Sequence, residues 1–195
     1  MQFLTFIVST ITQLYIIILL FRVWMQLVKI DFYHPVSQFV VKLTELVMRP
    51  LHRFIPSINM FDTATLLVSY ILTVVNIIFI MWVSNTLTLI SIKLLLISII
   101  QLLTYSGKLV FWLILIRVFF SWISQGSNPI DYAIMQLTEI IISPIRKIVP
   151  IINGIDFSPM IVTLILIALD YLRLNILLFI DPDVTNILYS IGYMI

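Results

Sequence analysis

Residues 63–83 read TATLLVSYILTVVNIIFIMWV, a run without a single charged side chain. A helix that crosses a bilayer needs about 20 predominantly apolar residues, and this run has that length. Working outward from it, comparable apolar runs occupy residues 3–27, 98–124 and 157–180. The sequence therefore predicts an all-α membrane protein with four transmembrane helices, at 3–27, 63–83, 98–124 and 157–180.

The composition supports the same class of protein. Hydrophobic residues make up 62% of the 195 positions and charged residues 10%, whereas a soluble domain carries about 25% charged residues. The mean hydropathy is +1.16. With no cysteine and a net charge of +2, disulfide scaffolds, thiolate metal sites and nucleic-acid binding are excluded. Two histidines and no nucleophile motif lead us to expect no catalytic, metal or cofactor-binding residues, and no cofactor.

The chain contains an internal repeat. Residues 35–62 align without gaps with residues 129–156, at an offset of 94, and the segment Arg22-Val23 returns as Arg117-Val118 at an offset of 95. We interpret this as a direct two-fold repeat, with residues 1–83 as the first copy, 84–97 as a connector, 98–180 as the second copy and 181–195 as a tail. Identical residues in the two copies include the pairs Pro35/Pro129, Leu43/Leu137, Thr44/Thr138, Glu45/Glu139, Pro50/Pro144 and Asp62/Asp156.

Each copy carries a short amphipathic segment. In residues 36–48 the apolar side chains recur at helical spacing, at positions 36, 39, 40, 43, 46 and 47, and residues 130–142 follow the same pattern. Such segments are too short and too polar to span a membrane. We expect two cytoplasmic helices, at 36–48 and 130–142, that lie at the membrane surface or cover the ends of the spans. Pro50 and Pro144 are predicted to end them.

The distribution of basic residues predicts the topology. The segments that join the two spans of each copy hold six basic residues: Lys29, Lys42, Arg49, Arg53, Arg146 and Lys147. The opposite side clearly holds only Lys93. By the positive-inside rule, both repeat loops are cytoplasmic and both termini lie outside. An alternative divides residues 87–125 into two short spans, which gives five spans and inverts the second copy.

Charged residues near or within the spans are candidate functional residues, because an intramembrane charge is costly. Asp170 and Arg173 lie three residues apart and can form a compensating pair, or they can belong to a polar path with Lys108. Arg22 and Arg117 lie near the ends of the first and third spans. Together with Arg53, Arg146 and Lys147, they are candidates for lipid-headgroup contact or for setting the topology.

The sequence resembles the YggT family of bacterial inner-membrane proteins. The resemblance covers nearly the whole chain and is carried by Arg22-Val23-Trp24-Met25, Phe32-Tyr33-His34-Pro35, Pro50-Leu51-His52-Arg53-Phe54-Ile55-Pro56, Asp156-Phe157-Ser158-Pro159 and the matching segments of the second copy. His52 departs from the pattern, because the family usually has arginine there. The resemblance implies a multi-pass inner-membrane protein without enzymatic activity.

The same resemblance implies links to osmotic-shock tolerance, and in chloroplast members to maturation of a b-type cytochrome. We therefore expect a membrane-assembly or scaffolding role, or a role in osmotic-stress tolerance. The alternative is a small transporter or channel component that uses the charged residues of the bundle. Expected partners are the lipid bilayer and other inner-membrane proteins or a second copy of the chain, with no nucleic acid and no small-molecule substrate identified.

Overall fold

The protein was analysed as a computed structural model, which describes residues 2–30, 35–52, 62–84, 92–123, 129–149 and 156–190. These residues form seven helices and no strand: α1 (Gln2–Val28), α2 (Pro35–Leu51), α3 (Thr63–Val83), α4 (Ile92–Ile123), α5 (Pro129–Arg146), α6 (Ser158–Ile180) and α7 (Pro182–Ser190). Four of them, α1, α3, α4 and α6, are long and apolar enough to cross a membrane. The prediction of an all-helical membrane protein with four such helices is confirmed.

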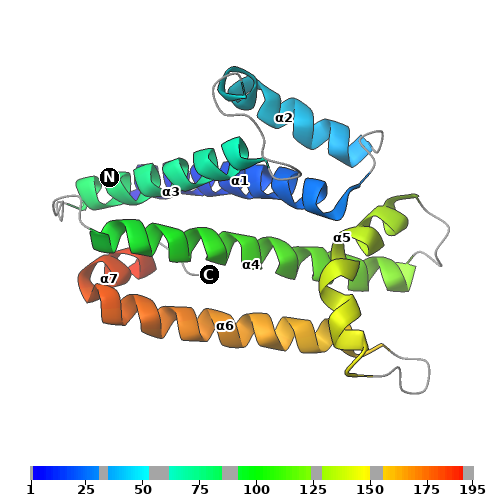
Figure 1. The fold of residues 1–195 in the computed structure, drawn as a ribbon. Coiled ribbons are helices and arrows are strands. Elements are labelled where there is room, and N and C mark those ends of the chain that lie inside the picture. The colour runs from blue at the N-terminus through cyan, green and yellow to red at the C-terminus, as the bar shows by residue number, and fades with distance from the viewer. Residues whose placement is uncertain are drawn as a thin grey trace.

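The four long helices run side by side (Figure 1). Helices α1 and α3 form one layer, α4 packs against both of them, and α6 packs on the far side of α4. Helix α2 lies over α1 and α3, whereas α5 runs across α4 and α6 and also contacts α1. The short helix α7 turns back from the end of α6 and reaches α3.

The helix bounds differ from the predicted ones by more than one residue in three places. Helix α4 begins at Ile92, six residues before the predicted span, because the apolar run continues in that direction. The prediction that Pro50 and Pro144 end their helices is wrong, since each proline lies inside the last turn of α2 or α5. A proline there removes a single helical hydrogen bond, and beyond Pro50 the His52 N–H still donates to the Met48 carbonyl, at 2.9 Å.

Helix α7 lies in the region predicted as a tail. Its start has the features of a capped helix, because Asp181 accepts a hydrogen bond from the Val184 N–H at 3.2 Å and Pro182 is the first helical residue.

Helix α1 ends in a tightly defined cap. Lys29 has φ 56°, in the left-handed region, and the Ile30 N–H donates to the Met25 carbonyl while the Lys29 N–H donates to that of Gln26. This pair of hydrogen bonds is the Schellman motif, which satisfies carbonyls that the helix leaves open. Ile30 is buried in the main core cluster, so the cap also directs the chain back against the bundle.

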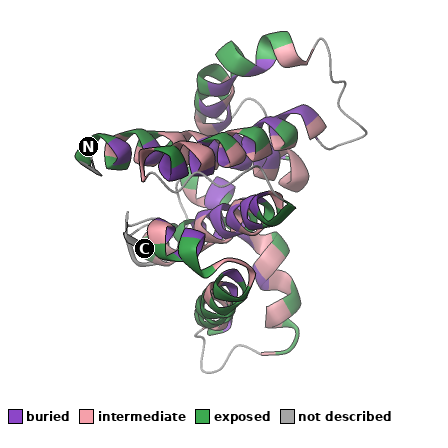
Figure 2. Ribbon diagram, turned by 90° about the vertical axis from the view of Figure 1, so that its left-hand side faces the viewer, coloured by how far each residue is buried: buried purple, intermediate pink, exposed green. Residues whose placement is uncertain are grey.

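The core combines large apolar side chains with small polar ones, and it lies where the long helices face one another (Figure 2). Ile77, Ile97 and Ile114 are buried in the main cluster. The buried hydroxyls of Ser69 and Ser98 donate to carbonyls four residues earlier in their own helices, at 2.8 Å. Small residues with internally satisfied hydroxyls are typical of helix contacts in membranes, because they let the backbones approach closely.

Candidate functional site

A cluster around Arg22 joins the first three helices. Arg22, near the end of α1, donates from Nη1 to Thr44 Oγ1 of α2 at 2.8 Å, and its Nε lies 3.4 Å from Asp62 Oδ2. Asp62 is the N-cap of α3, where its Oδ1 accepts a hydrogen bond from the Thr65 N–H. His52 Nε2 lies 3.5 Å from Asp62 Oδ2. One guanidinium therefore connects α1, α2 and the beginning of α3. We call Arg22, Thr44, His52 and Asp62 the Arg22 cluster.

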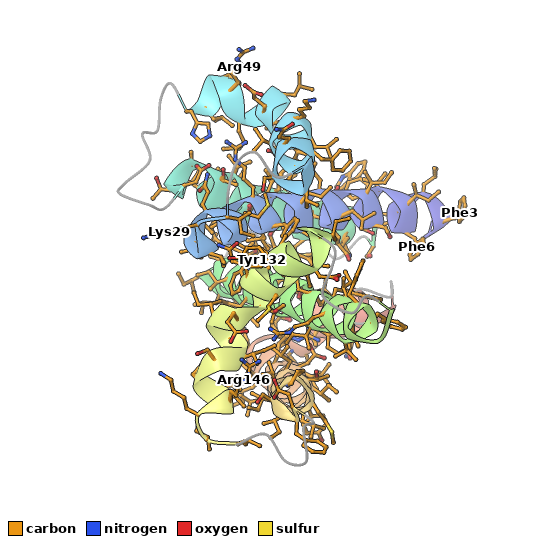
Figure 3. The ribbon with its side chains drawn as sticks, turned by 90° about the vertical axis from the view of Figure 1, so that its right-hand side faces the viewer. Phe3, Phe6, Lys29, Arg49, Tyr132 and Arg146 are labelled. Atoms are coloured by element: carbon orange, nitrogen blue, oxygen red, sulfur yellow. The ribbon has the colours of Figure 1, made fainter. Side chains whose placement is uncertain are left out.

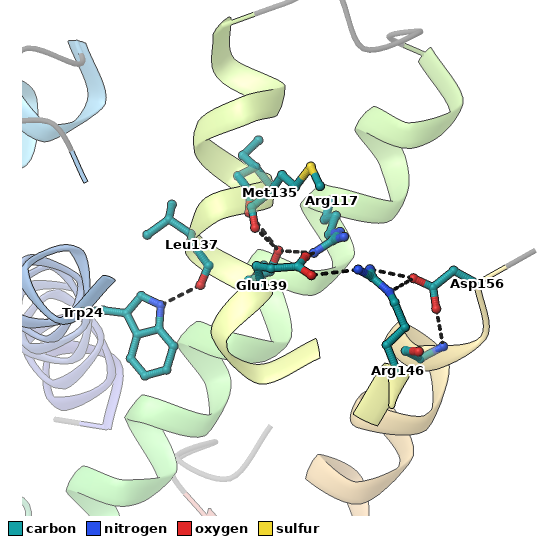
Figure 4. Close-up of polar contacts among 10 residues, drawn as sticks. Trp24, Arg117, Met135, Leu137, Glu139, Arg146 and Asp156 are labelled. Atoms are coloured by element: carbon teal, nitrogen blue, oxygen red, sulfur yellow. Dashed lines mark hydrogen bonds and ion pairs between the residues drawn. The ribbon is translucent and has the colours of Figure 1, made fainter. Parts of the chain in front are cut away.

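A second cluster surrounds Arg117 of α4 (Figure 4). Arg117 Nη1 donates to Thr138 Oγ1 at 2.8 Å and to Glu139 Oε2 at 3.2 Å, both on α5. Glu139 Oε1 accepts from Arg146 Nη1 at 2.7 Å. Arg146 also donates from Nε and Nη2 to Asp156 Oδ2, at 3.0 and 2.8 Å, just before α6 begins. We call these five residues the Arg117 cluster, and they connect α4, α5 and α6.

The ion pair between Arg146 and Asp156 shifts the pKa of both groups. The hydrogen bond to Asp156 raises the pKa of Arg146. Burial opposes the charged form of Asp156, but hydrogen bonds from Ser158 and Arg146 outweigh it and lower the pKa of this carboxyl. A carboxyl whose folded pKa is depressed contributes stability above its unfolded pKa of about 3.9, and the contribution is lost as the pH falls through the folded value. The pair is therefore fully charged at neutral pH.

The two clusters occupy corresponding positions in the sequence and differ in residue type at one of them. Arg22, Thr44 and Asp62 correspond to Arg117, Thr138 and Asp156 at the offsets of 95 and 94. His52 stands where the second cluster has Arg146, so the Arg22 cluster lacks the two charge-assisted hydrogen bonds that Arg146 makes to its aspartate.

The two copies also use their matching glutamates differently. Glu139 bridges two arginines, whereas Glu45 is half-exposed and lies 3.8 Å from Arg49 of its own helix. The Arg117 cluster is thus the more extensively bonded of the two.

Helix α2 presents three different faces. Ser37, Val40, Thr44 and Met48 are buried against the bundle. The side chains of Gln38, Lys42, Glu45 and Arg49 form an exposed polar face, and Figure 3 shows Arg49 pointing away from the rest of the chain. The remaining face is apolar and exposed: Phe39, Leu43, Leu46 and Val47. Of the predicted apolar stripe, Val40 is the member that is buried.

Two of the predicted intramembrane residues, Asp170 and Arg173, lie together on α6. Arg173 Nε is 2.9 Å from Asp170 Oδ1, and the Arg173 side chain is buried, with 7% of its surface exposed, whereas that of Asp170 is half-exposed. Nη1 and Nη2 of Arg173 make no hydrogen bond within the described part of the chain. Lys108 of α4 lies within electrostatic range of both residues. The structure therefore pairs Arg173 with Asp170 and places Lys108 in their neighbourhood.

Of the predicted basic contact residues, Arg22, Arg117 and Arg146 are part of the two clusters, and Lys147 is exposed directly after α5. Arg53 lies outside the described residues. Sequence reasoning missed the partners of the arginines: Thr44, Asp62, Thr138, Glu139 and Asp156. These partners could have been found because they are identical in the two copies of the repeat. A polar residue that recurs at matching positions in an apolar chain indicates a contact that both copies make.

Four apolar helices long enough to cross a membrane, joined at one end by arginine-centred contacts, define a multi-pass helical membrane protein. The chain belongs to the CCB3/YggT family, whose model matches it in two parts, residues 1–83 and 96–177. It is 45% identical over 170 residues to the uncharacterized protein YggT of Escherichia coli K12, covering 87% of this chain and 88% of that protein.

Other relatives are equally uncharacterized. One is a Vibrio alginolyticus protein encoded in the proC 3' region, 43% identical over 159 residues, with 81% of this chain and 86% of that protein covered. Another, from Pseudomonas aeruginosa, is 36% identical over 183 residues and covers 87% of both chains. No solved structure matches the chain.

Proposed function

We propose that this protein is a non-enzymatic membrane factor that scaffolds or helps to assemble other membrane proteins and supports the cell envelope under osmotic stress. The observation that carries the proposal is the pair of arginine clusters, because each one holds an amphipathic helix firmly against the ends of two long helices. A helix fixed in this way offers a preformed docking surface, which lowers the entropic cost of binding a partner.

The proposal includes the architecture predicted from the sequence. The two copies are direct repeats in the bacterial inner membrane, α2 and α5 are the interfacial helices at the cytoplasmic face, and both termini are periplasmic. The three faces of α2 support this placement, since a bundle face, an apolar face and a charged face suit a helix between protein, lipid and water. The basic residues around α2 and α5 agree with it under the positive-inside rule.

Lipid headgroups are a proposed partner of the exposed basic residues. Lys42, Arg49 and Lys147 project from α2 and from the end of α5 into solvent. Each basic residue near an anionic surface contributes about 1 kcal/mol of attraction. The same side chains set the topology, so headgroup contact and orientation act together.

The scaffold proposal is tested by weakening both clusters at the threonines. In a strain that lacks the protein, a Thr44→Val/Thr138→Val variant removes the hydroxyls that accept from the two arginines while keeping the side-chain shape. We expect normal insertion but loss of protection in a hyperosmotic growth assay, whereas the control Lys42→Gln, on the exposed polar face, should protect like the wild type. Full protection by the double variant would contradict the proposal.

A transporter or channel component is the alternative, and the buried polar groups favour it. Arg173 is buried beside Asp170, and the amide nitrogen and oxygen of the fully buried Gln101 make no hydrogen bond within the described residues. Such groups suit a polar path. Purified protein in proteoliposomes should then pass ions under an osmotic gradient, and Asp170→Asn should abolish the flux. An absence of flux would contradict transport and leave the scaffold proposal standing.

A further inference from the structure

Helix α5 makes a contact that helix α2 does not make. The indole Nε1 of Trp24 on α1 donates to the Leu137 carbonyl of α5 at 3.0 Å, which joins the second half of the chain to the first (Figure 4). Leu137 is 4% exposed and Ala133 is 6% exposed, so the face of α5 that carries them is covered. Within the described residues, α2 contacts α1 and α3 and has no corresponding contact with α4.

The corresponding face of α2 is exposed. At the offset of 94, Ala133, Leu137 and Ile141 correspond to Phe39, Leu43 and Val47. Leu43 is 43% exposed, and Phe39 and Val47 are exposed as well. The same apolar positions are thus covered in one half of the chain and open in the other. We call Phe39, Leu43 and Val47 the α2 face.

The receiving surface shows the same asymmetry. On α1, Trp24 contacts α5, and Ile17 and Phe21 lie on the same side of the helix, partly buried against the main core cluster. Their counterparts on α4, at the offset of 95, are Trp112, Ile116 and Phe119, which are exposed, by 60%, 38% and 59%. These three residues follow one another at i, i+4 and i+7, so they lie on one side of α4. We call them the α4 face.

The two exposed faces therefore match the two surfaces that already meet inside the chain. A contact is heterologous when its two sides are different surfaces. When such a contact joins units in a row, the first unit and the last unit each keep one of the two surfaces unused. Here the chain holds two units, the α2 face is exposed on the first unit, and the α4 face is exposed on the second.

We propose that the α2 face of one copy packs against the α4 face of a second copy in the same membrane orientation, with Leu43 beside Phe119, as α5 packs against α1. This contact extends the internal arrangement of the chain to a homo-oligomer. It is independent of the scaffold role, because it concerns how copies meet and not what they support.

The absence of native cysteine allows a direct test. Two differently tagged copies, one with Leu43→Cys and the other with Phe119→Cys, are expressed together, and intact membranes are treated with a short bis-maleimide. We expect a crosslinked dimer that carries both tags. Neither variant expressed alone should crosslink, because the contact pairs two different surfaces. Leu43 and Phe119 are both exposed, and equal membrane levels of the two variants confirm that they insert.

Matched controls distinguish this contact from random collision. In the first control, Leu67→Cys takes the place of Leu43→Cys and is paired with Phe119→Cys. Leu67 lies on α3, is apolar and 44% exposed, and is outside the proposed contact, so this pair should give no mixed dimer. The double variant Trp24→Cys/Leu137→Cys in one chain tests the reagent on the internal contact. In the mixed pair, an added Phe39→Glu on the Leu43→Cys copy should abolish the crosslink, since it places a charge in the apolar contact.

Three outcomes would overturn the proposal. Dimers of Leu43→Cys alone would mean that α2 meets α2 across a symmetric interface. Dimers of Phe119→Cys alone would mean the same for α4. No crosslink of any kind, with the internal control positive, would mean that lipid covers both faces.

Discussion

Replacing Glu139 by glutamine should destabilise the protein, whereas the same change at Glu45 should not. Glu139 accepts hydrogen bonds from Arg117 and Arg146 with its side chain about a third exposed. A hydrogen bond to a charged group contributes about 1.5–3 kcal/mol. Glutamine keeps one oxygen acceptor, and solvent weakens the remaining difference, so we expect a loss of about 2 kcal/mol in the free energy of unfolding.

The matched change, Glu45→Gln, serves as the control. The Glu45 carboxylate lies 3.8 Å from Arg49, and at least half of each side chain is exposed. An exposed pair with this spacing on a helix is worth about 0.3–0.5 kcal/mol. The two substitutions are chemically identical and occupy corresponding positions, so they differ in their surroundings alone.

A buried reporter cysteine measures the difference. In an Ala133→Cys background, a thiol-reactive dye reports the temperature at which α5 leaves the bundle, because position 133 is buried. For a chain of 195 residues, 1 kcal/mol shifts the midpoint by about 2–4 °C, so Glu139→Gln should lower it by about 4–8 °C and Glu45→Gln by less than about 2 °C. Equal shifts for the two variants would refute the assignment of Glu139 as the bridge.

Two further predictions concern charge and topology. Asp170→Asn and Arg173→Gln should each lower the amount of protein in membranes, because an unpaired charge near a helix centre costs about 2.5–3.5 kcal/mol on insertion. The double variant should restore the wild-type amount on a quantitative immunoblot. A double variant as depleted as the single variants would exclude a compensating pair. Lys42→Cys and Lys147→Cys should resist an impermeant thiol reagent applied from outside, while Asp183→Cys should react. Labelling of Lys147→Cys without labelling of Lys42→Cys would indicate the five-span alternative.

Helix positions followed from the sequence because long apolar runs leave few alternatives. The span predicted at 63–83 matches α3 from Thr63 to Val83, since Asp62 caps its start and the polar segment from Ser84 ends its apolar run. Helix α7 was not predicted, although Asp181-Pro182 is a typical helix beginning.

The spacing of the apolar residues did not predict which side of α2 packs on the bundle. In water the most apolar stripe of a helix faces the core, but in a membrane lipid is as apolar as leucine, so that stripe has no preference for protein. The bundle-facing side of α2 carries Ser37 and Thr44 as well as Val40 and Met48. Leu43, a member of the predicted apolar stripe, is exposed for this reason, whereas its counterpart Leu137 is buried because α1 reaches it.

The hydrogen bond between Trp24 and Leu137 also has a consequence for biogenesis. Its partners are 113 residues apart, and a ribosome adds about 5–20 residues per second, so α1 is made roughly 6–23 s before the helix that completes its packing. During that interval the indole of Trp24 lies in the nascent first half without the carbonyl that it bonds in the finished chain. The tryptophan contact therefore forms only late in synthesis, when the second half of the chain folds back onto a helix that has long since entered the bilayer.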